Sequence, residues 1–154
     1  RGLSPLMGLL ELEGASLEAH LAQFGIGFEM LGYDLLRASG VTKTQADKKN
    51  WEGRVRAVTS VTASVLPFEE DHFVDLLRRN YSAVKHADNA RPDRSEMHLA
   101  CRQAVQVFRS WVAIRLGMSK RKLRVALDDD AVTSHIREIE RVIARERKQS
   151  GRRA

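Results

Sequence analysis

The chain has 154 residues, of which 43% are hydrophobic and 30% charged, and its net charge is +6. This length and composition indicate one folded domain with a single core and exclude a disordered chain. A single cysteine, Cys101, excludes an intrachain disulfide and is typical of proteins of the cytoplasm. The sequence contains no apolar run of about 18 residues that would predict a membrane span, and no secretory leader.

The first predicted helix covers residues 15–38, where apolar side chains recur at alternating steps of four and three residues and so share one face. They are Leu17, Leu21, Phe24, Phe28, Leu31 and Leu35. Ser39-Gly40 is the expected stop. Because the chain begins at Arg1 without a methionine, we expect residues 1–14 to lead in from an upstream region of a longer protein. One domain is expected over 15–148, followed by a basic tail over 149–154.

The second predicted helix begins at a cap, Thr44, and runs to about Leu66. Its many β-branched residues leave a strand open as an alternative. The length of the segment and the lack of turn residues after Gly53 favour the helix. Pro67 is expected to open a third helix over 68–85. The apolar side of that helix consists of Phe73, Leu76, Leu77, Tyr81 and Val84.

A loop over 87–93 precedes the fourth predicted helix, which covers 93–116. Its buried stripe is Met97, Cys101, Ala104, Phe108 and Trp111, and a separate basic face carries Arg94, His98, Arg102 and Arg109. Lys120-Arg121-Lys122 is expected to be a connector. Asp128-Asp129-Asp130 is expected to cap a last amphipathic helix, with magnesium binding as the alternative. The sequence therefore predicts an all-α bundle of four to five helices.

The positive charge is concentrated in one part of the chain. Residues 78–124 carry 12 basic and 3 acidic side chains, whereas the segments before and after them are close to neutral or acidic. A focused basic patch favours polyanions such as nucleic acid, and a solvated basic surface is the alternative.

The run from Arg79 to His86 lies in this basic region, at the end of the third predicted helix. The two residues are seven positions apart, or two helical turns, so they project in nearly the same direction, away from the apolar side. Arginine can hold a phosphate by two parallel hydrogen bonds, and histidine can move a proton near neutral pH. Together they suffice to cleave RNA without a metal. An exposed polar helix end with no chemistry is the alternative.

The same spacing predicts a homodimer. Seven residues along a helix rise by about 10 Å, and the side chain of Arg79 leans toward the N-terminus, away from His86. One chain therefore cannot easily bring both groups to one phosphate. An antiparallel pairing of two third helices would place Arg79 of one chain near His86 of the other.

The run also resembles the signature of the HEPN superfamily, which is an arginine, a polar residue and then a histidine after four to six intervening residues. Here six residues intervene and Asn80 follows Arg79. Residues 10–18 and 28–33, the string Lys85-His86-Ala87-Asp88, the proline-containing loop and the long helix after it are similar to ApeA-like HEPN domains. The resemblance covers roughly residues 3–118.

The resemblance implies a metal-independent endoribonuclease without a cofactor that cuts single-stranded RNA or tRNA in phage defence, abortive infection or a toxin–antitoxin system. It implies that Arg79 steadies the scissile phosphate and that His86 is the general acid or base as the 2′-hydroxyl attacks. Asn80 would orient the substrate or the histidine, and Lys85 would bind phosphate. The basic face with Arg94, Arg102 and Arg109 is expected to add RNA contacts.

Two other kinds of function remain open for such a domain. One is a catalytically silent module that dimerises or binds nucleic acid, and the other is a domain whose basic face docks an acidic antitoxin. For an active enzyme, we expect an upstream sensor domain to release the activity. Intact Arg79, Asn80 and His86 favour the enzyme, because a silent module need not keep them.

Glu29, in the first predicted helix, is a further candidate for orienting Arg79 or His86, with an interhelix ion pair as the equal alternative. Cys101 lies on an apolar stripe and is expected in the core, not as a nucleophile. The remaining histidines show no ligand spacing that predicts a zinc site. They are His20, His72, His98 and His135.

Overall fold

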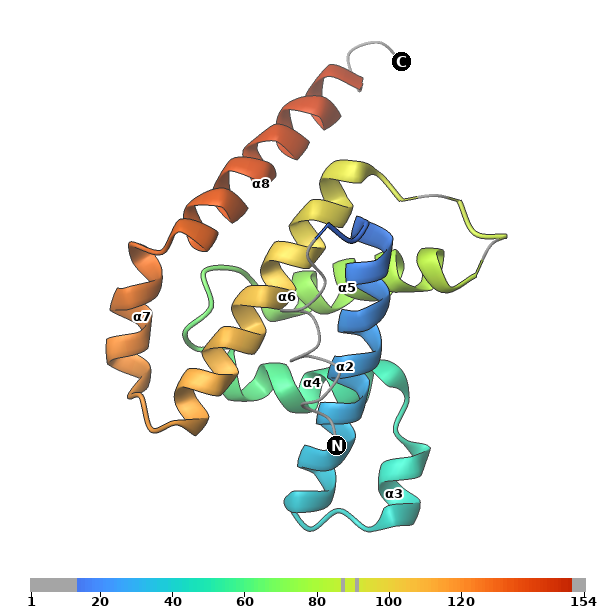
Figure 1. The fold of residues 1–154 in the computed structure, drawn as a ribbon, viewed down its shortest axis with the longest axis vertical. Helices are drawn as coiled ribbons and strands as arrows, with labels where there is room; N and C mark the ends of the chain where they lie inside the picture. The colour runs from blue at the N-terminus through green and yellow to red at the C-terminus, as the bar shows by residue number, and fades with distance from the viewer. Residues whose placement is uncertain (1–13, 87, 91, 151–154) are drawn as a thin grey trace.

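The computed structural model describes residues 14–86, 88–90 and 92–150, which form helices and no strand (Figure 1). The helices are α2 (Leu17–Ala38), α3 (Lys43–Lys48), α4 (Trp51–Thr62), α5 (Glu70–Lys85), α6 (Arg94–Arg115), α7 (Lys120–Asp128) and α8 (Ala131–Ser150). The predicted all-α bundle is confirmed, and the strand alternative for the β-branched segment is excluded because Val55, Val58 and Thr59 lie on α4.

The core lies where α2 packs against α4, α5 and α6. Phe28 of α2 meets Phe73 of α5 edge to face, with ring centroids 6.1 Å apart. α8 packs against α6, and α7 joins those two helices at one side of the molecule (Figure 1). The stripes predicted for the first and fourth helices face this core, which includes Leu21, Phe28, Met97 and Ala104.

The ends of α2 and α6 agree closely with the prediction. Ser16 caps α2, and the chain leaves that helix through Ser39 and Gly40, whose φ of 93° favours glycine. Asp93 caps α6 by accepting a hydrogen bond from the backbone N–H of Ser95 at 2.8 Å. Gly117, with φ 91°, follows the end of α6. A polar N-cap and a glycine after the last turn therefore determine where each of these two helices begins and ends.

The second predicted helix is wrong in its cap and its extent. Thr42, not Thr44, begins α3 through a capping box with Gln45. The backbone is then extended at Lys49, and Asn50 starts α4 by accepting a hydrogen bond from the N–H of Gly53 at 2.9 Å. α4 ends at Thr62, four residues before the expected end. Two local caps, Thr42 and Asn50, thus divide the segment that the sequence predicts as one helix.

Two further expectations are corrected. Pro67 does not open α5, which begins at Glu70 after a short loop. Lys120-Arg121-Lys122 is the first turn of α7 and not a connector, because Ser119 caps it and Leu123 and Leu127 are buried beneath. The expected cap of α8 is confirmed, since Asp130 Oδ1 accepts a hydrogen bond from the N–H of Val132 at 2.8 Å.

Two glycines of α2 allow neighbouring helices to come very close. A Cβ atom at Gly32 would lie 1.8 Å from the carbonyl oxygen of Arg54 on α4, and one at Gly25 would lie 2.3 Å from the ring of Tyr81 on α5. The carbonyl oxygen of Gly25 also accepts a hydrogen bond from Trp51 Nε1 at 3.0 Å. Because Gly25 has no side chain, the ring of Tyr81 can lie against α2, and the Gly25 carbonyl group holds the ring of Trp51. Both rings border the candidate site.

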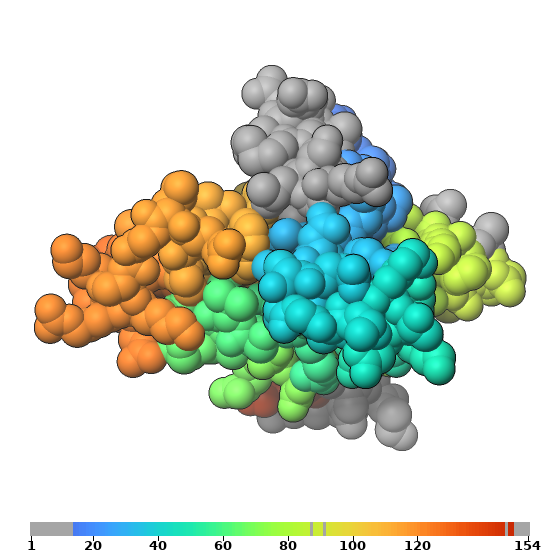
Figure 2. Space-filling view, turned by 90° about the horizontal axis from the view of Figure 1, so that it is seen from below, coloured from blue at the N-terminus to red at the C-terminus, as the bar shows by residue number. Residues whose placement is uncertain are grey.

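Seen from below, the molecule has two opposite edges, with α2, α3 and α4 between them (Figure 2). One edge is formed by the end of α6 with α7, and the other by the end of α5 and the residues after it. No helix among the described residues is long and apolar enough to cross a membrane. The expected lead-in segment (except Gly14) and residues 151–154 of the expected tail lie outside the described residues, and α8 extends to Ser150.

Candidate functional site

The end of α5 carries the predicted site. His86 follows the last helical residue, with extended backbone angles of φ −120° and ψ 113°, and its N–H donates to the carbonyl oxygen of Ser82 at 3.1 Å. Asn89 Nδ2 donates to the same oxygen at 3.1 Å. The side chains of Lys85 and His86 are both exposed. The helix end is thus fixed by backbone contacts while the imidazole remains open to solvent.

Arg79 is also exposed, as its spacing predicts, but two carboxylates hold it toward α6. Its Nε donates to Asp75 Oδ2 at 3.0 Å, and its Nη1 donates to Glu96 Oε2 at 3.1 Å. The side chain keeps 44% of its surface exposed. The guanidinium therefore links α5 to α6 within one chain.

Asn80 faces the core. Its side chain is fully buried, and its Nδ2 donates to the carbonyl oxygen of Leu76 one turn earlier at 2.8 Å. Its Oδ1 is buried and has no hydrogen-bond partner among the described residues. In this structure Asn80 contacts its own helix and not the surface around His86.

A hollow of about 340 Å³ lies beside His86, and we call it the His86 hollow. It is lined by Arg78, Tyr81, Ser82, Lys85 and His86 of the α5 segment, by Asn50, Trp51 and Glu52 at the start of α4, and by Glu29 of α2. Arg79 is not among these residues. Arg78, the residue before Arg79 in the chain, lines the hollow together with His86. Its Nη2 donates to Asp75 Oδ1 at 2.8 Å.

An aromatic pair forms part of this lining. The rings of Trp51 and Tyr81 stack with centroids 5.6 Å apart and planes 19° from parallel. Lys85 Nζ lies 5.6 Å from the centroid of the Tyr81 ring, within the range of a cation–π contact. The hollow therefore combines cations, two carboxylates and aromatic rings.

Two pKa shifts describe the electrostatics of this region. Hydrogen bonds from Arg78 and then Arg79 hold the pKa of Asp75 below its usual range, so Asp75 stays ionised between the two arginines. Burial, together with the charge of Glu29, raises the pKa of Tyr81. The hydroxyl of Tyr81 therefore remains a neutral donor at physiological pH.

Glu29 forms an ion pair with Arg54 of α4, with Oε1 and Nη1 2.7 Å apart. Both side chains are partly buried, and the Arg54 guanidinium also lies 5.4 Å from the Tyr33 ring centroid. This is the interhelix ion pair that the sequence left open. Glu29 nevertheless lines the His86 hollow as well, so the ion pair fixes a carboxylate at its border.

The other three arginines predicted to contact RNA lie in different parts of the structure. Arg94 lines a second hollow of about 990 Å³ with His98, between the start of α2, the end of α5 and the start of α6. Arg102 is partly buried on α6. Arg109 forms an ion pair with the cap of α8, since its Nη2 lies 2.9 Å from Asp130 Oδ2. Of these three arginines, only Arg94 lies near the end of α5.

Cys101 lies in the core, as the apolar stripe predicts. Its surface is 8% exposed, and burial raises the pKa of its thiol to about 12. A thiol with this pKa is almost entirely protonated at neutral pH and is a poor nucleophile. Cys101 is therefore a packing residue.

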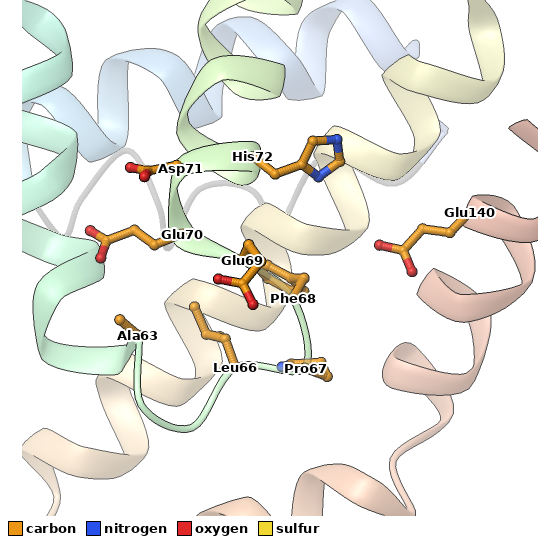
Figure 3. Close-up of a pocket in the computed structure, with 9 residues that line it drawn as sticks. All are labelled: Ala63, Leu66, Pro67, Phe68, Glu69, Glu70, Asp71, His72 and Glu140. Carbon is orange, nitrogen blue, oxygen red and sulfur yellow. The ribbon is translucent and has the colours of Figure 1, made fainter. Parts of the chain in front are cut away.

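An acidic hollow of about 790 Å³ lies at the opposite end of α5 (Figure 3). Glu69, Glu70, Asp71 and His72 line it from the start of α5, and Glu140 extends toward them from α8. The hydroxyl of Thr59 donates to Glu70. Within the described residues, no group of three or more histidine, cysteine or carboxylate side chains is arranged to hold a metal ion.

Sequence reasoning missed Trp51, Arg78, Ser82 and Tyr81 as residues of the site. Arg78 directly precedes the run from Arg79 to His86 and Ser82 lies within it, so the sequence contains a signal for both. Trp51 lies some thirty residues earlier in the chain, and only the packing of α4 against α5 brings it to His86. The sequence predicts Tyr81 on the apolar side of its helix, and the ring does lie against Gly25 of α2 while also bordering the hollow.

Comparisons of this chain with protein-family models, with curated proteins and with solved structures find no match. The resemblance to the HEPN superfamily therefore stays a prediction that depends on the residues quoted above.

Proposed function

We propose that the chain is a HEPN-type, metal-independent endoribonuclease that acts as a homodimer on single-stranded RNA or tRNA. The observation that carries the proposal is the exposed His86, which shares a hollow with two cationic side chains, Arg78 and Lys85. A proton-transfer group beside cations is what cleavage of a phosphodiester without metal requires.

The chemistry assigned to these residues is a transfer within the RNA. The 2′-oxygen attacks phosphorus, and the bond from phosphorus to the 5′-oxygen breaks, which leaves a 2′,3′-cyclic phosphate and a free 5′-hydroxyl. His86 would take the proton of the 2′-hydroxyl or supply one to the leaving 5′-oxygen. Arg79 and Lys85 would stabilise the additional negative charge on the phosphate.

The dimer is part of the proposal because Arg79 and His86 do not share a hollow in one chain. An antiparallel pairing of two α5 helices would place Arg79 of one protomer near His86 of its partner, as in an isologous two-fold interface. In cells, we propose that the domain serves phage defence in the cytoplasm, with an upstream sensor domain or an antitoxin controlling it.

The decisive test is incubation of the purified chain with total RNA in excess chelator. We expect cleavage with cyclic phosphate ends, and its abolition by His86→Ala and by Arg79→Ala. His72→Ala is the matched control, because His72 is an exposed histidine on the same helix. Loss of cleavage in the chelator, or full activity of either site variant, would refute the proposal.

A complementation experiment tests the dimer. Mixing the inactive His86→Ala and Arg79→Ala chains creates mixed dimers in which one of the two sites is intact. About a quarter of the parent activity is expected to return if the chains exchange freely. No recovery, despite exchange shown by labelled chains, would overturn the composite site.

A catalytically silent module for dimerisation or nucleic-acid binding is the second candidate. The engagement of Arg79 by Asp75 and Glu96 favours it, because an arginine held by two carboxylates has less capacity to bind a phosphate. RNA binding without cleavage by the full chain would support this candidate over the nuclease.

A further inference from the structure

The His86 hollow has three chemically different surfaces. α5 contributes the cations Arg78 and Lys85 together with His86, whereas α2 and α4 contribute the carboxylates Glu29 and Glu52. Each carboxylate has one oxygen bound to an arginine, with Glu29 to Arg54 at 2.7 Å and Glu52 to Arg56 at 3.0 Å. The stacked rings of Trp51 and Tyr81 supply the third surface.

A nucleotide offers the matching three groups. Its phosphate is an anion for the cationic side, and its base presents a flat face for stacking on aromatic rings. An ionised carboxylate accepts hydrogen bonds but cannot donate them. Amino groups on the edge of a base can donate hydrogen bonds to it. A simple polyanion matches the cations alone and would be repelled by Glu29 and Glu52.

The size of the hollow limits the ligand further. Its volume of about 340 Å³ is near the lower end of the range for small-ligand pockets, roughly 300–1,000 Å³. Such a space suits one nucleotide and not a helix of paired bases. The bases of a duplex are also stacked on one another, so their faces cannot reach a protein ring.

We propose that the His86 hollow binds one unpaired nucleotide, with its base against Trp51 and Tyr81 and its phosphate toward Lys85 and His86. This inference rests on the proposed nuclease only for the identity of the polymer, an RNA strand. The carboxylates at the hollow select bases that carry an exocyclic amino group over uracil. Glu29 and Glu52 are therefore the specificity-determining residues, Trp51 and Tyr81 supply the surface for stacking, and Arg78 adds a contact for the strand.

The experiment uses a trinucleotide of 2′-O-methyl RNA, which has no 2′-hydroxyl to attack and so reports binding without cleavage. The full chain is titrated into this labelled probe and into one whose central nucleotide lacks its base. We expect the abasic probe to bind about tenfold more weakly than the probe with all three bases. Stacking of one base contributes severalfold to over a hundredfold in affinity. Equal binding of the two probes, or no binding of either, overturns the proposal.

Intrinsic fluorescence gives a second measurement with the unaltered protein. The chain has two tryptophans, and Trp111 is buried with 6% of its surface exposed. Stacking of a base beside Trp51 should quench part of the fluorescence, with more quenching by adenine, cytosine or guanine trinucleotides than by uracil. Binding without any quenching, or an equal response to uracil, contradicts the assigned pocket.

Variants locate the site without depending on one substitution. Trp51→Leu is expected to weaken binding about tenfold, whereas Trp51→Phe, which keeps an aromatic face, retains most of the affinity. Arg78→Ala is expected to weaken it severalfold, because it removes one cation from a half-exposed position. Arg141→Ala, an exposed arginine of α8, is the control. Unchanged affinity in both Trp51→Leu and Arg78→Ala overturns the proposal.

Failure of this inference is distinguishable from failure of the proposed function. If the chain cleaves RNA but the abasic and base-containing probes bind equally, the hollow is not a base pocket and the nuclease stands. If the probes show the expected difference but RNA is never cleaved, the nucleotide pocket stands and the domain is a binding module.

Discussion

The contact between α2 and α4 and the contact between α6 and α8 are built in opposite ways. Between α2 and α4, the absence of a side chain at Gly32 lets the two helix backbones touch. The Glu29–Arg54 ion pair also joins these two helices. At the second, Ile136 and Ile139 of α8 are buried, but α6 and α8 also bury polar atoms without hydrogen-bond partners among the described residues. These atoms are Gln103 Oε1, Gln106 Nε2 and Oε1, Ser110 Oγ, Trp111 Nε1 and Thr133 Oγ1.

The difference bears on which part of the fold holds the candidate site. The α2–α4 contact supports Trp51 and Glu29 at the His86 hollow, so a rigid contact there keeps the hollow in shape. Within the described residues, the α2–α4 contact buries one polar atom without a hydrogen-bond partner, Arg54 Nε, whereas α6 and α8 bury six. Each such atom is a cost, because a buried polar group without a partner loses its hydration. We expect α8 to separate from the bundle before α4 does.

The largest effect is expected from Gly32→Ala. The new methyl group would lie 1.8 Å from the carbonyl oxygen of Arg54, so α2 and α4 must move apart. We expect the free energy of unfolding to fall by roughly 4 kcal/mol or more, measured by urea denaturation. Gly53→Ala is the control, since its methyl group meets side-chain atoms only, the nearest being Asn50 Oδ1 at 3.1 Å. Equal stability of the two variants would show that the close approach is not required.

Ile136→Ala tests the opposite contact. Ile136 is fully buried against α6 and the core, and its truncation is expected to cost about 3 kcal/mol. Hydrogen exchange should accelerate in α8 more than in α2, because α8 loses one of its few apolar anchors. Val142→Ala, at a position 40% exposed on the same helix, is the control. Uniform acceleration in both helices would contradict a separable α8.

Gln106→Leu is expected to have a smaller effect, in the stabilising direction. Both side-chain polar atoms of Gln106 are buried without partners among the described residues, so an apolar side chain of similar size removes a desolvation cost. We expect a gain of about 1 kcal/mol in thermal or urea unfolding. The same change at the exposed Gln149 is the control. A destabilised Gln106→Leu chain would show that this amide is satisfied in solution.

The smallest effect is expected from Glu140→Gln and depends on pH. Burial raises the pKa of Glu140, so the folded state takes up a proton more readily than the unfolded state. The contribution of this group to stability is present below its ordinary pKa and is lost as pH rises through the raised value. Glu140→Gln should therefore raise the unfolding midpoint slightly at pH 7 and leave it unchanged near pH 4.

Glu138→Gln, an exposed position on the same helix, should show neither change. A midpoint of Glu140→Gln that is lower than that of the parent at pH 7 would mean that the charged form of Glu140 stabilises the contact with α6. Its hydrogen bond from Gln103 Nε2, at 3.3 Å, would then outweigh its burial.

The sequence by itself determined the helical class, the bounds of α2 and α6, and the exposure of Arg79 and His86. These follow from periodicity and from local caps such as Ser16 and Asp93, whose partners lie within one helical turn. It did not determine the break between α3 and α4, because no glycine or proline marks it within residues 43–52 and Asn50 starts a new helix through one side-chain hydrogen bond.

The tertiary structure alone decided which residues surround His86. Periodicity places Arg79 and His86 on one side of α5, but carboxylates from its own helix and from α6 draw Arg79 away from the hollow. Trp51 and Glu29 come to His86 from other helices, through contacts between residues far apart in the chain. Such contacts depend on how helices pack and not on local spacing, which is why the candidate site was only partly readable from the sequence.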